Sequence, residues 1–288
     1  MKKLSYLLLG MVLFTGCGRN SGNGAKVKIG EDFTEKISGV ELEMVYVKGG
    51  MFRMGATEEQ GNDADFYEKP VHSVTLSDYF IAKYEVTQEL WETVMGMTLD
   101  QQRIKAAYDY DDDGLCGVGS DYPVYYVSWN DAQEFCKKLS KLTGKKYALP
   151  TEAQWEYAAR GGGKSKGYKY SGSNDIGEVA WYEGYEIGWV GRSDRFNGSV
   201  HPVGTKAPNE LGIYDMSGNI YEWCSDGWGN YSGDAQTNPT GVAESAGHVL
   251  RGGCWISGDA KECRVSGRSW GRSGSRTYRY GFRVVLVP

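Results

Sequence analysis

One stretch decides the fold of this chain: LGIYDMSGNIYEW, residues 211–223. It is preceded by LPTEAQWEYAARGG at 149–162 and followed by RGGCW at 251–255, CRVSGR at 263–268 and GFR at 281–283. With 41 glycines in 288 residues, we expect short strands joined by many turns, since glycine permits tight turns. We expect Trp223, Trp255 and Phe282 to supply core area in a domain short of regular elements.

Arginines crowd into the same segments. They would either line a pocket for an anionic ligand or form internal ion pairs with nearby carboxylates, and we favour the internal pairs. The arginines are Arg251, Arg264, Arg268 and Arg283, and the carboxylates are Asp215, Glu222 and Asp226. Two further acids, Glu152 and Glu156, lie four residues apart as a catalytic pair could, but helix pairing and solvation explain them adequately.

Capping signals predict three helices. The expected caps and stops are Thr87 with an end near Met95, Ser128 with Asp131 and an end at Gly144, and Thr151 with Gln154 and an end at Gly161. In the second helix the apolar spacing makes Cys136 a buried hydrophobe. Before these helices, residues 70–80 alternate as a strand does, with His72, Val74 and Leu76 on one face. We expect His72 to be a core or strand-edge residue rather than a ligand.

The N-terminus predicts an anchor. Lys2 and Lys3 precede an apolar run of signal-peptide length, which is too short to span a bilayer. The run ends in Gly16-Cys17, which resembles a bacterial lipobox, so we expect residues 1–16 to be a lipoprotein signal peptide and Cys17 to be acylated. An Asp directly after the acylated Cys would suggest retention in the inner membrane, but Gly18 stands at that position. This favours the outer membrane. The polar stretch 17–38 is read as a flexible tether, and 39–288 as one folded domain.

Taken together, the quoted motifs resemble the formylglycine-generating enzyme, or sulfatase-modifying factor, family over roughly 44–288. The resemblance implies an irregular mixed α+β fold related to the C-type lectin fold. It also implies a calcium site with ligands from Asp215, Gly218, Ile220 and Glu222, which are hard oxygen donors suited to Ca²⁺.

Cysteine usage separates this chain from the enzymes it resembles. Apart from Cys17 there are five cysteines, an odd number, so at least one stays free or pairs outside the chain. The resemblance implies Cys224 and Cys263 as a possible disulfide, because both signature segments pack in the same half of the family's fold. Enzymes of the family carry a copper(I)-binding pair in a pattern like MCHxSYC after the GGS[YW] segment. The matching stretch 256–262 contains no cysteine.

We therefore expect no copper and no catalytic residue. The resemblance then implies a lipid-anchored envelope protein that acts as a binding or scaffold component for another envelope protein or a glycan. The alternative is a formylglycine-generating oxidase acting on sulfatase cysteines, with Cys254 and Cys263 as its thiolates. The net charge of −5 gives no basic footprint, so nucleic acid is not an expected partner.

Overall fold

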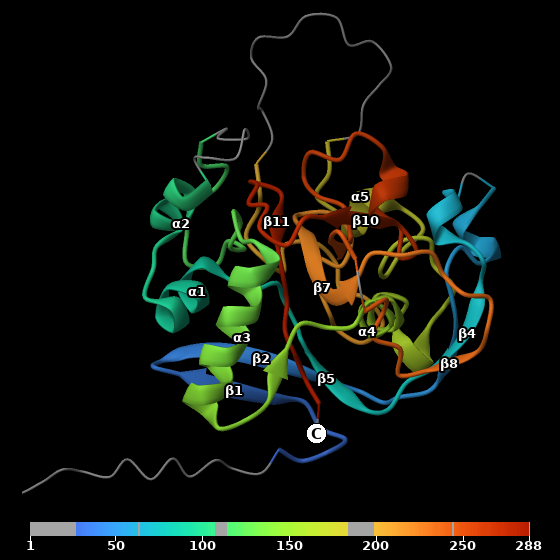
Figure 1. Cartoon of the computed structure of the whole chain (residues 1–288), viewed down its shortest axis with the longest axis horizontal. Helices are drawn as coiled ribbons and strands as arrows, with labels where there is room; N and C mark the ends of the chain where they lie inside the picture. Colours follow the sequence, from blue (N-terminus) through green and yellow to red (C-terminus); the bar gives the residue numbers. More distant parts are fainter. Residues whose placement is uncertain (1–26, 63, 107–113, 184–198, 244, 288) are drawn as a thin grey trace, which may run out of the picture.

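Three sheets form the framework of the protein, as the computed structural model shows for residues 27–62, 64–106, 114–183, 199–243 and 245–287 (Figure 1). The largest sheet has the strand order β1-β2-β5-β12-β6, the second β10-β9-β7-β11, and the third β3-β4-β8. The strands are β1 Phe33–Ile37, β2 Val40–Val47, β3 Met51–Met54, β4 His72–Thr75, β5 Tyr79–Ala82, β6 Tyr147–Ala148, β7 Tyr221–Gly227, β8 Gln236–Thr237, β9 His248–Arg251, β10 Arg268–Gly271, β11 Tyr280–Gly281 and β12 Val285–Leu286.

Helices cover the sheets unevenly. In Figure 1, α1, α2 and α3 lie to one side of the molecule, while α4 lies beside β7. The α-helices are α1 Gln88–Met95, α2 Leu99–Ala106, α3 Trp129–Thr143, α4 Glu152–Ala159 and α5 Ile176–Val179, and the 3-10 helices are η1 Glu58–Gln60, η2 Phe66–Glu68, η3 Gly162–Lys164 and η4 Ala260–Cys263. The mixed α+β architecture expected from the sequence is confirmed. The sequence analysis did not predict α2, whose sequence LDQQRIKA has no regular apolar stripe.

The three expected helix starts are confirmed. The Thr87 side chain accepts a hydrogen bond from the Leu90 amide, and both Ser128 and Thr151 form reciprocal capping boxes, with Asp131 and Gln154. These caps satisfy backbone amides that have no partner inside the helix. The third cap matters most for the site, because it fixes where α4 begins and so where Glu152 lies.

The folded domain begins earlier than the sequence analysis placed it. Residues 33–37, assigned to the tether, form β1, which pairs with β2 from Phe33 opposite Met44 to Ile37 opposite Val40. Ile37 is buried, and the Phe33 ring lies edge-on to Phe80 with 5.1 Å between centroids. The tether boundary at residue 38 is therefore wrong, because two apolar side chains in a polar segment suffice to close a hairpin onto the largest sheet. The predicted lipidation site Cys17 lies outside the described residues.

The core is divided between two large groups of buried side chains. One lies between the largest sheet and helices α1 and α3, and it contains Trp223, Trp255, Phe282 and the buried Cys136 as expected. The other gathers around α4 and includes Trp155 and Cys224. Within the described ranges, no helix is both long and apolar enough to cross a bilayer.

Candidate functional site

The turn from Cys254 to Cys263 occupies the position where the sequence comparison expected copper-binding thiols. The Ser257 hydroxyl accepts a hydrogen bond from the Cys254 amide at 3.0 Å and donates to a Glu262 carboxylate oxygen at 2.8 Å. The same oxygen of Glu262 accepts from the Tyr221 hydroxyl at 2.7 Å. The stretch 256–262 thus presents a hydroxyl and a carboxylate that already satisfy each other.

Cys254 and Cys263 are neighbours inside this turn. Both are buried, and a side chain at Gly253 would come within 2.6 Å of the Cys263 sulfur, so only glycine lets the chain pass there. Burial raises the pKa of the Cys254 thiol to about 11. Burial also holds the pKa of Cys263 well above its usual value, and the nearby Cys254 raises it further. Both groups are therefore thiols, not thiolates, near neutral pH.

The expected disulfide between Cys224 and Cys263 is not formed. The five described cysteines are all free and buried. Cys224 is part of β7 and packs in the group around α4, whereas Cys263 ends η4 and packs with Tyr170 and Val179. The two side chains therefore pack in different groups of buried residues.

The predicted calcium residues lie on and beside a loop with unusual backbone geometry. Asp215 and Asn219 have positive φ values of 58° and 59°, and Gly218 has φ 80°. A side chain at Gly218 would approach the Trp181 carbonyl oxygen to 2.3 Å, which explains why glycine is required there. Left-handed residues without glycine's freedom are uncommon, and they concentrate at ligand-binding and functional sites.

Buried carboxylates surround this loop. Asp215 and Glu222 are joined by Glu85, which the sequence analysis missed, and all three side chains are almost fully buried. Glu85 accepts hydrogen bonds from the Asn219 side chain at 2.7 Å and the Ile220 amide at 3.3 Å. The one available signal was a charged residue directly between Tyr84 and Val86 at the end of an apolar strand. We call Glu85, Asp215 and Glu222, with Arg283, the acidic cluster.

The acidic cluster contains three carboxylates and one guanidinium. Arg283 donates to both oxygens of Glu222, at 2.6 and 2.7 Å, and Trp155 donates to Glu222 as well. Among the described residues, only the Gly204 amide donates a hydrogen bond to the Asp215 carboxylate, at 2.7 Å. Burial, followed by the charges of Asp215 and Glu222, raises the pKa of Glu85 well above its usual range. With all three carboxylates ionised, the cluster would hold an excess of buried negative charge, so either a proton on Glu85 or a bound cation balances it.

A divalent cation would balance this negative charge, but not all of the predicted ligands are available to bind it. Three ionised carboxylates and one arginine leave two negative charges, while the Glu222 oxygens already face Arg283. Within the part of the chain that the structure describes, no three His, Cys, Asp or Glu side chains converge on a common metal position. An ion here would need Asp215, Glu85 and backbone carbonyls of the 215–222 loop as its ligands.

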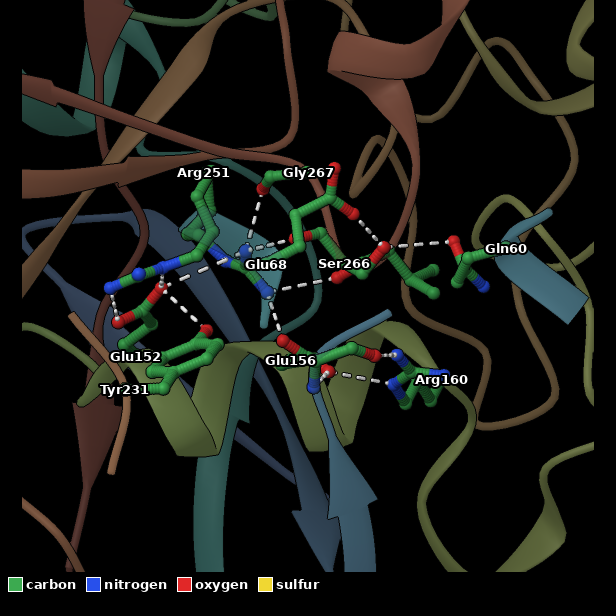
Figure 2. A network of polar contacts seen from close by, with 12 residues as sticks. Gln60, Glu68, Glu152, Glu156, Arg160, Tyr231, Arg251, Ser266 and Gly267 are labelled. Atoms are coloured by element: carbon green, nitrogen blue, oxygen red, sulfur yellow. Dashed lines mark hydrogen bonds and ion pairs between the residues drawn. The ribbon is translucent and has the colours of Figure 1, made fainter. Parts of the chain in front are cut away.

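A second set of buried charges is fully matched (Figure 2). Arg251 donates to Glu156 and to the carbonyl oxygens of Val265, Ser266 and Gly267. The full set, here called the arginine network, consists of Arg160, Arg251, Arg264 and Arg268 paired with Glu59, Glu68, Glu152 and Glu156. Four guanidinium groups meet four carboxylates, so this network leaves no net charge.

The arginine network confirms the internal role expected for the arginines and corrects two of its details. Arg283 pairs with Glu222 as expected, but Arg251, Arg264 and Arg268 pair with glutamates from α4 and η2. Glu152 and Glu156 are not solvated helix residues, since both are buried. Glu156 does form the expected helix pair with Arg160, but sequence spacing could not reveal the burial, because Arg251 and Arg268 come from β9 and β10.

Comparison with known proteins agrees with these features. Residues 31–287 match the family model described as sulfatase-modifying factor enzyme 1-like domain. The chain is 32% identical to Chaperone protein LppX of Paenibacillus barcinonensis, with 76% of this chain and 80% of that protein covered. It is also 32% identical to the formylglycine-generating enzyme of Streptomyces coelicolor, with 84% and 88% covered.

Solved structures give the same picture. Treponema denticola variable protein 1 superposes with a TM-score of 0.72 at 29% identity, over 89% of this chain and 99% of that one. Equal identity to a protein named as a chaperone and to one named as an enzyme means that overall similarity does not decide the chemistry. The residues of the site have to decide it.

Proposed function

This chain belongs to the sulfatase-modifying factor enzyme 1-like family, and from that premise we propose that it is a non-oxidising member. In this proposal it is held in the cell envelope by a lipid and acts as a binding or scaffold component. Its partner would be another envelope protein or a glycan. The fold is the family's irregular mixed α+β fold, and what differs is the chemistry of one turn.

The observation that carries the proposal is the hydrogen-bonded pair of Ser257 and Glu262. These residues stand in the stretch that would supply copper-binding thiolates, and they bond to each other at 2.8 Å. Hydroxyl and carboxylate are hard ligands and do not hold copper(I) tightly. Binding remains as the function that a rigid, well-packed domain without this centre can perform.

The anchoring part rests on the sequence Leu13-Phe14-Thr15-Gly16-Cys17. Acyl chains on Cys17 would place the domain at a membrane surface, with the residues before β1 as the spacer. The test is fractionation of cells expressing the full chain and a Cys17→Ala variant. We expect the parent protein to remain in membranes after a high-salt wash and the variant to be released. A variant that stays with the membranes would contradict lipidation at Cys17, and a Ser21→Ala variant is the matched control.

Calcium binding at the acidic cluster is part of the same proposal. The expected ligands from the sequence were Asp215, Gly218, Ile220 and Glu222, and the charge excess of the cluster supports a divalent cation there. Glu85 joins the set, while Glu222 is better described as the residue that holds Arg283 beside the ion. The bound ion would fix the 215–222 loop, and through it the start of β7 beneath the Cys254–Cys263 turn.

A second candidate function, copper oxidase activity, is favoured by one observation: Cys254 and Cys263 lie side by side. In this alternative the two thiols replace the family's pair with a rearranged one. Their raised pKa values and complete burial oppose it, because thiolates are the copper ligands and the substrate must reach them. A search for the formylglycine product separates the two functions.

A further inference from the structure

Next to the arginine network lies a cavity of about 270 Å³ that none of the foregoing uses. Its walls combine apolar side chains, among them Met54, Ala153 and Val242, with the polar residues His72 and Asp226. Glu152 and Tyr231, both labelled in Figure 2, form the side that the cavity shares with the arginine network. The cavity is large enough for a short aliphatic chain with a polar head.

Asp226 is the one carboxylate of this region that the arginine network does not neutralise. The four guanidinium groups of that network are matched by four glutamates, and none of its ion pairs includes Asp226. One oxygen of Asp226 accepts the Glu152 amide at 2.9 Å and the Ser225 hydroxyl at 3.0 Å. The other oxygen, Oδ1, has no hydrogen bond from the described residues, although the side chain is only 3% exposed. Asp226 lines the cavity, so a ligand that enters it can donate a hydrogen bond to this oxygen.

The more buried polar side chains Arg268, His72 and Tyr231 offer no free donor, whereas Asn230, Gln236 and Thr240 line the more exposed part of the cavity. Arg268 is fully engaged, since it donates to Glu152, to the Tyr67 carbonyl and to the Gly229 carbonyl. His72 donates its Nδ1 proton to the Pro70 carbonyl at 3.1 Å, so in the tautomer with a single N–H group Nε2 is an acceptor. The Tyr231 hydroxyl donates to Glu152. An anionic ligand would therefore meet only acceptors in the buried part of the cavity.

The backbone around Asp226 is shaped to keep this space. Gly241 has φ +74°, and a side chain there would come within 2.6 Å of the Asp226 Cβ atom. Side chains at Gly227 and Gly229 would likewise collide with Val242. Glycines thus allow the 239–242 segment to close over Asp226 without filling the cavity.

We propose that this cavity binds a primary alkylammonium group, with the ammonium at Asp226 Oδ1 and its carbon chain against Met54, Ala153 and Val242. An ammonium supplies both the missing donor and the missing positive charge, and apolar walls suit a methylene chain. The group could belong to a lysine side chain of a polypeptide or to a small free amine, since both present the same chemistry. This inference stands on the cavity alone and does not depend on the anchor or on calcium.

The test is a titration of the folded domain with n-butylammonium chloride and with Nα-acetyl-lysine methylamide, followed by backbone amide NMR shifts of Gly227, Gly229 and Gly241. We expect saturable shifts with a Kd on the order of 1 mM for at least one probe. The ratio of the two affinities then tells a free amine from a polypeptide lysine. Sodium chloride at equal concentration and neutral n-butanol should produce shifts at least tenfold weaker.

Two variants make the test specific. Asp226→Asn keeps an acceptor for the Glu152 amide but removes the charge, and it should weaken ammonium binding at least tenfold. Asp234→Asn, the same change on an exposed residue of the neighbouring loop, should stay within twofold of the parent. Val242→Trp, which would fill the rim of the cavity, should weaken both probes even if Asp226→Asn fails to fold. No saturable shift up to 50 mM probe, on the order of fifty times the expected Kd, or equal binding of butanol would overturn the proposal.

Discussion

The arginine network and the acidic cluster are both sets of buried charges, but only one is balanced. The arginine network pairs four guanidinium groups with four glutamates, while the acidic cluster sets Arg283 against Glu85, Asp215 and Glu222. A balanced set needs nothing from outside the chain, so its role is to hold α4, β9 and β10 together. The acidic cluster is balanced either by protons on its carboxylates or by a bound cation, and a cation in place of the protons would extend its role to a ligand.

The largest effect on stability should come from removing one arginine of the balanced arginine network. Arg251→Met removes the donor to one oxygen of Glu156 and to three buried carbonyl oxygens, while the other Glu156 oxygen keeps Arg160 and the Gly55 amide. We expect the free energy of unfolding in urea to fall by about 3–5 kcal/mol, as for other broken buried ion pairs. Arg272→Met, at an exposed arginine, should change it by less than about 0.5 kcal/mol. A loss below about 1 kcal/mol for Arg251→Met would show that the network is not structural.

The acidic cluster should respond to calcium, and the arginine network should not. Calcium at a hundredfold excess over its Kd stabilises the native state by about 2.7 kcal/mol, which raises the melting temperature of a domain this size by roughly 5–10 °C. The measurement is a thermal scan of protein stripped with chelator, with and without Ca²⁺. Asp215→Asn should abolish the response, while Glu41→Gln, an exposed carboxylate on β2, should keep it. If adding Ca²⁺ left the melting temperature of the chelator-stripped protein unchanged, the proposed cation site would be refuted.

Asp226 lies beside the balanced arginine network but has no ion pair in it, so its carboxylate should make the stability of the protein depend on pH. Burial and the charge of Glu152 raise the pKa of Asp226 to about 7 from an unfolded value near 3.8. Because the folded-state pKa is the higher one, the unfolded chain loses its proton first, and stability falls as pH rises from about 4 to 7.

Asp226→Asn removes this loss. We expect the variant to be more stable than the parent by about 1–2 kcal/mol at pH 8. This gain is smaller than the full pKa shift of Asp226 would give, because burying the amide of the new asparagine also costs free energy. Near pH 4 the two proteins should converge. Chemical denaturation at both pH values gives the comparison, and a variant less stable than the parent at pH 8 would contradict it.

Sequence reasoning reached the elements whose signals are local and missed those set by distant partners. The three caps at Thr87, Ser128 and Thr151 were readable because cap and partner lie three residues apart. The Glu156–Arg160 pair was readable from i, i+4 spacing, but the burial of Glu152 and Glu156 was not, because Arg251 and Arg268 come from β9 and β10. Glu85 was missed for the same reason, because its hydrogen-bond donors, Asn219 and Ile220, lie far from it in the sequence. The motifs predicted the family, and only the packing revealed which charges are matched.

The smallest expected effect bears on the central claim, that this domain keeps the family's fold without its copper oxidase. Both charge sets consist of oxygen and nitrogen groups, and the thiols of Cys254 and Cys263 are buried with raised pKa values. The decisive measurement is mass spectrometry of a Cys-x-Pro-x-Arg peptide incubated in air with reduced protein preloaded with copper(I). We expect no formylglycine above the protein-free control. A formylglycine product that disappears in Cys254→Ala or Cys263→Ala would contradict the claim and identify these thiols as a rearranged copper pair.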